Sequence, residues 1–427
     1  MNSFLIAAPS SGAGKTLVTL GLLRAFKNMG VAVSSAKAGP DYIDPAFHAV
    51  ATHSTCINLD PWAMRASYLA SLVTETASGS SHLVVEGMMG LYDGAADGTG
   101  SAADLAEGLG LPVILVVDVS SMSFSVAALV KGFRDHKPSL NFAGVILNKV
   151  GSPRHEAMLR NALVAETIRV FGAIPRVKSL ELPSRHLGLV QAAEHEALEM
   201  FIEQAAETIS GHCDLNALLD LQGDTKSQTE CTGLQPLGQR IAIAHDRAFS
   251  FAYPHVLQAW QGAGAELFYF SPLEDEAPRA DADAVFLPGG YPELFAEKLS
   301  NASRFKDGLV KAAKAKALIY GECGGYMVLG AGITDADGNR HAMAGLLRLE
   351  TSFEERKLHL GYRQIRANEF VLGDNLRGHE FHYTRAVLED GPSLFEATDA
   401  MGNALGSFGL KDQNVMGSYM HIIDRVS

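Results

Sequence analysis

The chain has 427 residues, of which 47% are hydrophobic and 19% are charged. This length exceeds what one hydrophobic core usually supports, so we expect two or three domains, and the composition is typical of buried parallel sheets rather than of disordered chains. The formal net charge of −13 argues against nonspecific binding to nucleic acids or anionic membranes, because both require a positive surface.

The N-terminal residues and the cysteines bear on the cellular location. Met1 to Phe4 leads directly into an apolar strand rather than into a signal peptide, and the chain has no run of 18 apolar residues. We therefore predict a cytoplasmic protein. The four cysteines are widely spaced, which indicates neither a zinc site nor a disulfide framework; they are Cys56, Cys213, Cys231 and Cys323.

Short apolar runs alternate with helical segments through the first half of the chain. This alternation is typical of βαβ units and predicts an α/β domain built on a parallel sheet over residues 1–210. Residues 211–238 turn polar and lack apolar periodicity, which favours an interdomain linker. The apolar runs, read as strands, lie at 4–8, 31–36, 83–86, 112–118 and 143–148.

A second series of apolar runs begins after the linker. The runs at 240–244, 284–287 and 317–320 predict a second α/β domain over residues 239–427.

Residues 8–16, Ala-Pro-Ser-Ser-Gly-Ala-Gly-Lys-Thr, lie between the first strand and a helical run at 17–29. This is the context of a phosphate-binding loop. Backbone N–H groups around Gly12 and Gly14 would bind the phosphates of ATP, Lys15 would neutralise their charge, and the Thr16 hydroxyl would coordinate Mg²⁺. Pro9 replaces the first glycine of the usual motif, and a plain glycine-rich turn is the alternative.

Charged residues mark the ends of two further predicted strands. Lys37, Asp41 and Asp44 follow one strand, where ligands of open α/β sheets bind, although the two aspartates are also suited to shaping a proline-rich turn. Glu86 ends an otherwise apolar strand; a carboxylate there is costly unless it binds a cation, so we predict a second Mg²⁺ ligand, with a helix cap as the alternative. Asp93 either faces the substrate or turns the chain.

The stretch from Gly321 to Gly325, Gly-Glu-Cys-Gly-Gly, follows an apolar strand and precedes a helical run. This pattern is typical of a nucleophile elbow, in which glycines permit a strained backbone and the helix N-terminus lowers the thiol pKa. Cys323 is therefore a candidate nucleophile, and a small buried residue is the alternative. His421 is the candidate base, with His379 and His382 as rivals.

Three glycines are candidates for an oxyanion hole through their backbone N–H groups: Gly289 and Gly290 in a separate stretch, and Gly324 directly after the cysteine. Together, the phosphate loop and the cysteine elbow predict an enzyme that activates a carboxylate with ATP in one domain and releases ammonia from glutamine in the other.

The chain resembles the cobyrinate a,c-diamide synthase family, which includes the hydrogenobyrinate a,c-diamide synthases of cobalamin biosynthesis. The resemblance extends over nearly the whole chain and is carried by six stretches, at 10–16, 39–45, 86–94, 185–189, 288–293 and 321–325.

The resemblance implies an ATP- and corrinoid-binding N-terminal domain similar to dethiobiotin synthetase and a C-terminal class I glutamine amidotransferase domain. It implies that ATP phosphorylates the a and c acetate carboxylates of hydrogenobyrinic or cobyrinic acid, and that ammonia released at Cys323 displaces the phosphate. By the same resemblance, His421 is the base and Glu86 binds the metal. The residues implied to line the corrinoid and phosphate site are Asp41, Tyr42, Asp44 and Asp93.

One position departs from class I amidotransferases. These enzymes usually carry a glutamate two residues after the histidine, where this chain has Ile423. The branch that the chain resembles lacks that glutamate as well, and Asp424 lies in the wrong register to replace it. The residue that orients His421 is left open.

Two other functions remain as alternatives. One is a sister amidotransferase, either cobyric acid synthase or the nickel-sirohydrochlorin a,c-diamide synthase; the other is a regulatory P-loop ATPase with an inactive amidotransferase-like domain. Overall resemblance favours metal-free hydrogenobyrinic acid over the cobalt-containing substrate, and a homodimer is compatible with the sequence.

Overall fold

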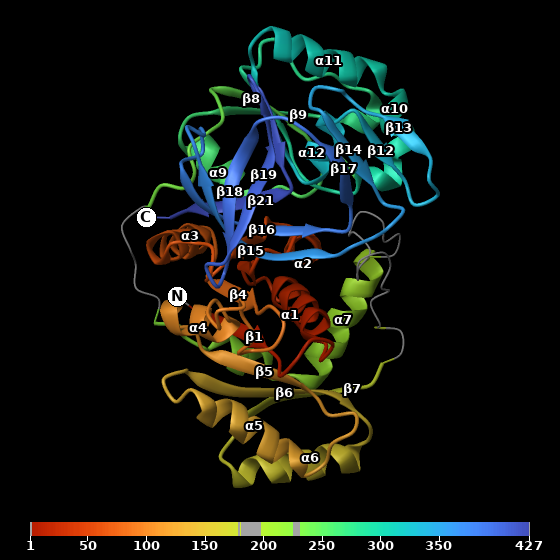
Figure 1. Cartoon of the computed structure of the whole chain (residues 1–427). Helices are drawn as coiled ribbons and strands as arrows, with labels where there is room; N and C mark the ends of the chain where they lie inside the picture. The colour runs from red at the N-terminus through yellow and green to blue at the C-terminus, as the bar shows by residue number, and fades with distance from the viewer. Residues whose placement is uncertain (1, 178–179, 181–197, 225–230, 427) are drawn as a thin grey trace. The chain divides into compact units, whose positions relative to one another are not determined.

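The computed structural model describes residues 2–177, 180, 198–224 and 231–426 (Figure 1). The chain divides into two compact units, and we describe each by itself. Unit 1 comprises Met1–Trp62 and Ala66–Cys231, and unit 2 comprises Ala63–Arg65 and Thr232–Ser427. No helix in the described ranges combines the length and the apolar character needed to cross a bilayer.

Unit 1 is built on a parallel sheet with the strand order β3-β2-β4-β1-β5-β6-β7. The middle strands are almost entirely buried, as expected for a parallel sheet covered by helices on both faces. The strands are β1 Asn2–Ala7, β2 Val33–Ala38, β3 Ile57–Leu59, β4 His82–Glu86, β5 Val113–Asp118, β6 Phe142–Val150 and β7 Val170–Pro175.

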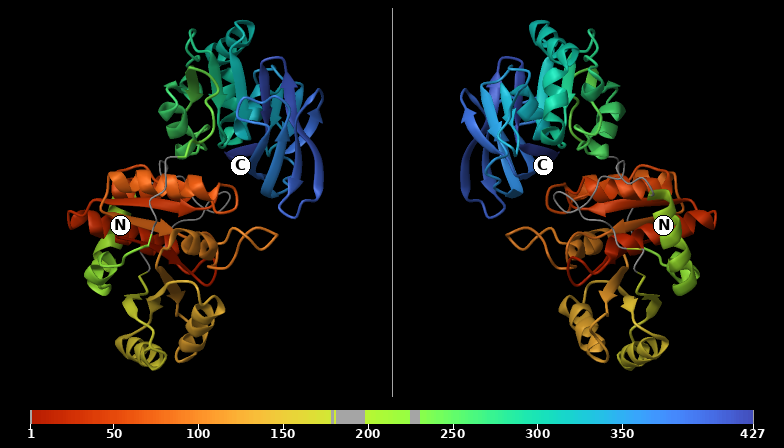
Figure 2. Two further views of the ribbon diagram at one scale, coloured as in Figure 1. Left: turned by 90° about the vertical axis from the view of Figure 1, so that its left-hand side faces the viewer. Right: turned by 90° about the vertical axis from the view of Figure 1, so that its right-hand side faces the viewer.

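Helices cover the unit 1 sheet (Figure 2). Alternate residues of the central strands, such as Phe4 and Ile6 of β1, point to the face that packs against α1, α2, α7 and α8. The helices are α1 Lys15–Asn28, α2 Ile43–Thr52, α3 Ala66–Ser78, α4 Ala102–Leu109, α5 Ser125–His136, α6 Pro153–Ala165, α7 Leu198–His212 and α8 Leu215–Leu219.

Helix α1 follows the predicted phosphate loop and is covered by α7. A Cβ atom at Gly21 of α1 would lie 2.5 Å from Cγ1 of Ile209 and 2.9 Å from the carbonyl oxygen of Ala205, both on α7. On the sheet side, the rings of Phe4 and Phe26 pack edge to face at 6.5 Å. The loop is therefore attached to a helix that is packed tightly on two sides.

The predicted linker at 211–238 needs correction. Its first part completes α7 and forms α8, and Leu218 belongs to the core of unit 1. Helix α8 is only five residues long, too short to show the apolar periodicity of a helix in the sequence. The boundary between the units falls between Cys231 and Thr232, and residues 225–230 lie outside the described ranges.

Unit 2 contains a ten-stranded mixed sheet with the order β21-β16-β15-β18-β19-β20-β11-β10-β8-β9 and a four-stranded sheet with the order β13-β12-β14-β17. In the larger sheet, β20, β11, β10, β8 and β9 are parallel neighbours, and the other strands extend it in antiparallel fashion (blue in Figure 2).

The elements of unit 2 have the following bounds. Its strands are β8 Arg240–Ala244, β9 Glu266–Phe270, β10 Ala284–Leu287, β11 Leu318–Glu322, β12 Gly332–Thr334, β13 Arg340–Ala342, β14 Leu349–Ser352, β15 His359–Ala367, β16 Asn375–His382, β17 Arg385–Glu389, β18 Ser393–Asp399, β19 Ala404–Asp412, β20 Val415–Ser418 and β21 Met420–Arg425. Its helices are α9 Pro254–Gly262, α10 Ala296–Asn301, α11 Ser303–Lys314 and α12 Gly324–Leu329.

Candidate functional sites

The loop between β1 and α1 is held by a side chain from β6. Gly14 caps α1 with φ +93°, and a Cβ atom there would lie 2.2 Å from the amide nitrogen of Asn148. That amide donates a hydrogen bond of 2.9 Å to the carbonyl oxygen of Ala13. The Asn148 amide nitrogen therefore holds the phosphate loop in place.

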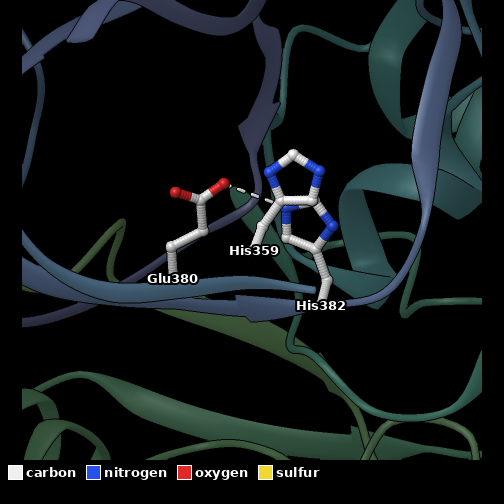
Figure 3. A group of neighbouring side chains, drawn as sticks. All are labelled: His359, Glu380 and His382. Carbon is white, nitrogen blue, oxygen red and sulfur yellow. Dashed lines mark hydrogen bonds and ion pairs between the residues drawn. The ribbon is translucent and has the colours of Figure 1, made fainter. Parts of the chain in front are cut away.

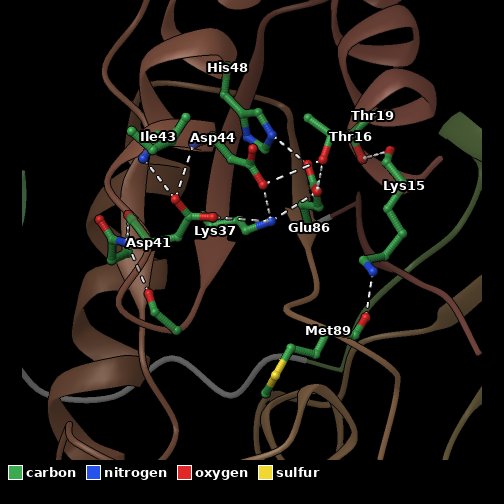
Figure 4. A network of polar contacts seen from close by, with 12 residues as sticks. Lys15, Thr16, Thr19, Lys37, Asp41, Ile43, Asp44, His48, Glu86 and Met89 are labelled. Atoms are coloured by element: carbon green, nitrogen blue, oxygen red, sulfur yellow. Dashed lines mark hydrogen bonds and ion pairs between the residues drawn. The ribbon is translucent and has the colours of Figure 1, made fainter. Parts of the chain in front are cut away.

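Lys37 lies at the centre of a buried charge cluster (Figure 4). Its Nζ atom contacts Asp44, lies 2.9 Å from Oε1 of Glu86 and lies 3.9 Å from Oδ2 of Asp41. The Thr16 hydroxyl donates to the same Glu86 oxygen at 2.8 Å. Lys37 on β2 is paired in register with Glu86 on β4, so the parallel sheet itself brings these two side chains together.

The charges in this cluster stabilise one another. Burial alone would favour the neutral forms of Lys37 and of its carboxylate partners. The contacts of Lys37 with Asp44 and Glu86 outweigh burial and raise the pKa of Lys37. For Glu86 burial is likewise outweighed, by Lys37 and His48, and its pKa falls below the usual range. Lys15, whose ammonium group donates to the carbonyl oxygen of Met89, has a pKa lowered mainly by burial.

The oxygen atoms of this cluster suit a magnesium ion. The Oδ1 atom of Asp44 is buried and has no hydrogen-bond partner among the described residues. The Thr16 hydroxyl lies 3.4 Å from the other oxygen of Asp44 and also contacts Glu86. Hydroxyl and carboxylate oxygens are the ligands that Mg²⁺ prefers, so Thr16, Asp44 and Glu86 fit this ion.

His48 is a member of the cluster that sequence reasoning missed. Its Nε2 atom lies 2.7 Å from Oε2 of Glu86, and its Nδ1 atom lies 3.5 Å from the sulfur of Cys56. Burial lowers the pKa of His48, but its interactions with Cys56 and Glu86 outweigh burial and raise it to about 10. The signal was present, because His48 lies one helical turn after Asp44 on α2.

A cavity of about 810 Å³ opens over this cluster in unit 1. Tyr42 and Asp93 are not among its lining residues. Tyr42 precedes α2 as its N-cap residue, and a carboxylate oxygen of Asp93 accepts a hydrogen bond of 2.9 Å from the backbone N–H of Gly90, which supports its turn-forming alternative. The predicted site residues that line the cavity are Gly12, Gly14, Lys15, Thr16, Lys37, Asp41, Asp44 and Glu86.

In unit 2, Cys323 occupies a strained turn between β11 and α12. Its backbone has φ +46° and ψ −105°, a conformation that a side-chain-bearing residue rarely adopts. A Cβ atom at Gly325 would lie 1.9 Å from the carbonyl oxygen of Leu287 on β10, so this position requires glycine. The turn at Cys323 therefore has the strained, glycine-dependent backbone that the predicted nucleophile elbow requires.

Cys323 and His421 lie together against Gly289. A Cβ atom added at Gly289 would lie 2.4 Å from Cε1 of His421 and 3.4 Å from Cβ of Cys323. One added at Gly324 would lie 3.1 Å from the backbone nitrogen of Gly290. The structure therefore brings together the predicted thiol, imidazole and oxyanion-hole glycines.

The ionisation of the pair differs from the sequence prediction. A helix N-terminus was expected to lower the pKa of the Cys323 thiol, but α12 is only six residues long, and burial instead raises that pKa above its usual value. Burial, with His379 and His382 nearby, lowers the pKa of His421 to about 3. Burial therefore favours the neutral form of both side chains.

The rival base His382 is already engaged through both ring nitrogens. Nδ1 lies 3.1 Å from the carbonyl oxygen of Thr384, and Nε2 lies 3.0 Å from Oε1 of Glu380. The ring also stacks on Tyr419 at 4.0 Å. The other rival, His379, packs edge to face on Tyr362. His421 is therefore the better-placed base.

His359, Glu380 and His382 form a close group that could be taken for a metal site (Figure 3). The two imidazole rings stack face to face, with centroids 4.6 Å apart and planes 7° apart. Because ring-nitrogen lone pairs lie in the ring plane, parallel stacked rings do not direct them to one point. The second carboxylate oxygen of Glu380 pairs with Arg363 at 2.7 Å. We interpret the group as a stacked and hydrogen-bonded support between β15 and β16.

The residues after His421 do not orient it. Both carboxylate oxygens of Asp424 accept hydrogen bonds of 3.0 Å from the guanidinium of Arg65, and the side chain of Ile423 is buried and apolar. The stretch at 185–189 that carried part of the resemblance lies outside the described residues.

Two family models together match most of the chain. Residues 4–190 match the family described as the CobQ/CobB/MinD/ParA nucleotide binding domain, and residues 240–425 match the CobB/CobQ-like glutamine amidotransferase domain. The chain is 55% identical to a hydrogenobyrinate a,c-diamide synthase from Sinorhizobium sp and 54% identical to one from Rhizobium meliloti, with 99% of each chain covered. It is 48% identical to the enzyme of the same name from Rhodobacter capsulatus, with 98% of each chain covered.

Proposed function

This chain belongs to the hydrogenobyrinate a,c-diamide synthase family of glutamine-dependent amidotransferases, and from that premise we propose that it amidates two acetate carboxylates of hydrogenobyrinic acid with ATP and glutamine. The observation that carries the proposal is the unit 1 cavity. Its lining combines a phosphate loop, two buried lysines and a set of carboxylates, which is what activation of a carboxylate by a nucleotide requires.

In the first step, a substrate carboxylate oxygen attacks the γ-phosphorus of ATP, the bond to the β-phosphate oxygen breaks, and ADP leaves. Lys15 and Lys37 would offset the charge on the phosphates, and backbone N–H groups around Gly12 and Gly14 would orient them. A magnesium ion held by Thr16, Asp44 and Glu86 would supply further charge neutralisation when bound.

In the second step, unit 2 releases ammonia from glutamine. His421 takes the proton of the Cys323 thiol, and the sulfur attacks the side-chain amide carbon to form a thioester. Backbone N–H groups of Gly289, Gly290 and Gly324 would stabilise the oxyanion. The proton on His421 passes to the leaving nitrogen, and water then hydrolyses the thioester to glutamate.

In the last step, ammonia attacks the carbonyl carbon of the acyl phosphate, and phosphate leaves as the amide forms.

The need for ATP and glutamine supports a cytoplasmic location. Light scattering of the purified protein will decide whether it forms a homodimer.

The proposal is tested with glutamine labelled with ¹⁵N in its amide group. Wild type should incorporate two labelled amides into hydrogenobyrinic acid, detected by mass spectrometry. Cys323→Ala should lose this reaction with glutamine and recover it with ammonium salts, because only ammonia release depends on the thiol.

A parallel assay with cobyrinic acid serves as the substrate control. Faster amidation of hydrogenobyrinic acid supports the proposed substrate, and faster amidation of cobyrinic acid assigns the cobalt-containing one. If neither corrinoid is amidated while nucleotide still binds, the diamide-synthase proposal fails.

A further inference from the structure

The glutamate that directly precedes Cys323 reaches toward His421. Oε2 of Glu322 lies 3.8 Å from Nδ1 of His421, and both side chains are buried. His421 has no carboxylate two residues after it, because position 423 is isoleucine. Glu322 therefore lies where its carboxyl group can act as the partner of the His421 imidazole.

Two donors fix the other oxygen of this carboxyl group. Oε1 of Glu322 accepts hydrogen bonds of 3.2 Å from the Tyr320 hydroxyl and from the backbone N–H of Ile422. Tyr320 precedes Glu322 by two residues on β11, so both side chains project from the same face of the strand. With Oε1 anchored in this way, Oε2 is the oxygen left to face His421.

We propose that Glu322 is the positioning residue for His421, replacing the glutamate that class I amidotransferases usually carry after their histidine. This inference rests on the proposed roles of Cys323 and His421. As a carboxylate, Glu322 accepts a hydrogen bond from the Nδ1–H group of His421, which leaves the Nε2 lone pair available to the thiol.

With Glu322 in this role, every proton transfer in ammonia release involves only the thiol, His421 and the substrate. The thiol proton moves to Nε2 of His421 as sulfur bonds to the amide carbon, and the imidazolium is then paired with the Glu322 carboxylate. The same proton moves to the leaving nitrogen when the carbon–nitrogen bond breaks. Catalytic hydrogen bonds are often long before substrate binds, so the 3.8 Å separation is expected to shorten in the complex.

The arrangement has a pH signature. Burial raises the pKa of Glu322 to about 8, against the opposing hydrogen bonds from Ile422 and Tyr320. The carboxylate therefore forms as the pH rises through that value, and glutamine hydrolysis should rise with it. Other charged or titratable groups also face the pair: His379, His382 and Glu380 face His421, and Glu293 and Glu380 face Cys323.

The test compares Glu322→Gln with Glu389→Gln as a matched control. Glu389 also accepts a tyrosine hydroxyl, that of Tyr326 at 2.6 Å, but it is exposed and does not face His421. Glu322→Gln should lower kcat for glutamine hydrolysis by about 10- to 100-fold with little change in KM, because only proton transfer is impaired. It should also lose the rise of activity near pH 8, and Glu322→Asp should restore part of both.

Ammonia-dependent amidation separates this inference from the proposed function. It should be unchanged in Glu322→Gln, since that reaction does not need the thiol. If Cys323→Ala keeps glutamine-dependent activity, the proposed role of the thiol fails. If Cys323→Ala behaves as proposed but Glu322→Gln keeps the kcat and pH profile of wild type, the role of Glu322 is overturned.

A second variant covers the case in which Glu322→Gln does not fold. Tyr320→Phe keeps the carboxyl group and removes one of its two anchors. It should lower the rate of iodoacetamide alkylation of Cys323 several-fold and shift the pH profile of that rate. A wild-type rate and profile in Tyr320→Phe would count against the proposal.

Discussion

At the scale of single residues, Lys37 is the position in unit 1 where we expect a substitution to reduce stability most. It is the cation around which three carboxylates gather, and it is almost completely buried. Removing one member of a buried ionic group is more harmful than removing an exposed pair, because the remaining charges stay buried without compensation. Lys37, which the sequence predicted only as part of a ligand site, therefore also has a structural role.

We therefore expect Lys37→Met to lower the free energy of unfolding by about 3–5 kcal/mol. Urea denaturation checks this value. Lys149→Met is the matched control, because Lys149 pairs with Asp118 at 2.6 Å while both remain partly exposed, and its removal should cost under about 1 kcal/mol. Equal effects of the two substitutions would contradict this account of the cluster.

Single residues also show how far the sequence predicts the sites. Lys15, Thr16, Lys37 and Glu86 could be found because each lies at a strand end or in a short motif. His48 and Glu322 were not found. The helical spacing brings His48 near Asp44, but its contact with Glu86 and the contact of Glu322 with His421 join residues that are distant in the sequence.

At the scale of elements, the contact between α1 and α7 determines how the phosphate loop is supported. Gly21 allows the two helices to approach closely, although glycine is a poor helix former. A methyl group at this position has to displace Ile209 or the backbone of Ala205. Gly21 therefore lowers the intrinsic stability of α1 but allows α1 to pack closely against α7.

Gly21→Ala should accordingly destabilise the protein by about 1–3 kcal/mol through overpacking. Gly132→Ala provides the matched control, because Gly132 lies inside α5 with open space around it, and it should stabilise by about 0.5–1 kcal/mol. Thermal unfolding of both variants measures the difference. A stabilising Gly21→Ala would show that α1 and α7 separate more easily than the structure indicates.

Elements differ in how clearly the sequence predicts them. The buried strands β1, β4, β5, β8 and β10 are continuous apolar runs, and the predicted ranges agree closely with the structure. The antiparallel strands β15 to β19 were not predicted. β15 and β16 alternate more and less buried residues, β17 and β19 are mostly exposed, and the pairing of all five is set by distant partners.

At the scale of the whole molecule, the two α/β units each have their own core and each contain one of the two candidate sites. The phosphate loop and its charge cluster belong to unit 1, and the thiol, imidazole and glycines belong to unit 2. The α/β class of both halves was predictable from the alternation of runs. The exact boundary was not, because the polar stretch before it includes the short helix α8.

This division predicts that the two sites can be disabled separately. Lys15→Ala should weaken nucleotide binding by about 10- to 100-fold, since a charged contact to phosphate is lost. Titration calorimetry with ATP and magnesium measures the affinity. The rate at which iodoacetamide alkylates Cys323 should stay at the wild-type value, and a parallel loss of alkylation would indicate that the substitution disturbs more than unit 1.

The hydrogen bond from Asn148 to the carbonyl oxygen of Ala13 bears on the thermodynamics of nucleotide capture. A loop that is already fastened has few conformations to lose when a ligand arrives. The entropy cost of ordering the loop is met during folding. Nucleotide binding therefore loses little loop entropy, and most of the attraction between the loop and the phosphates contributes to affinity.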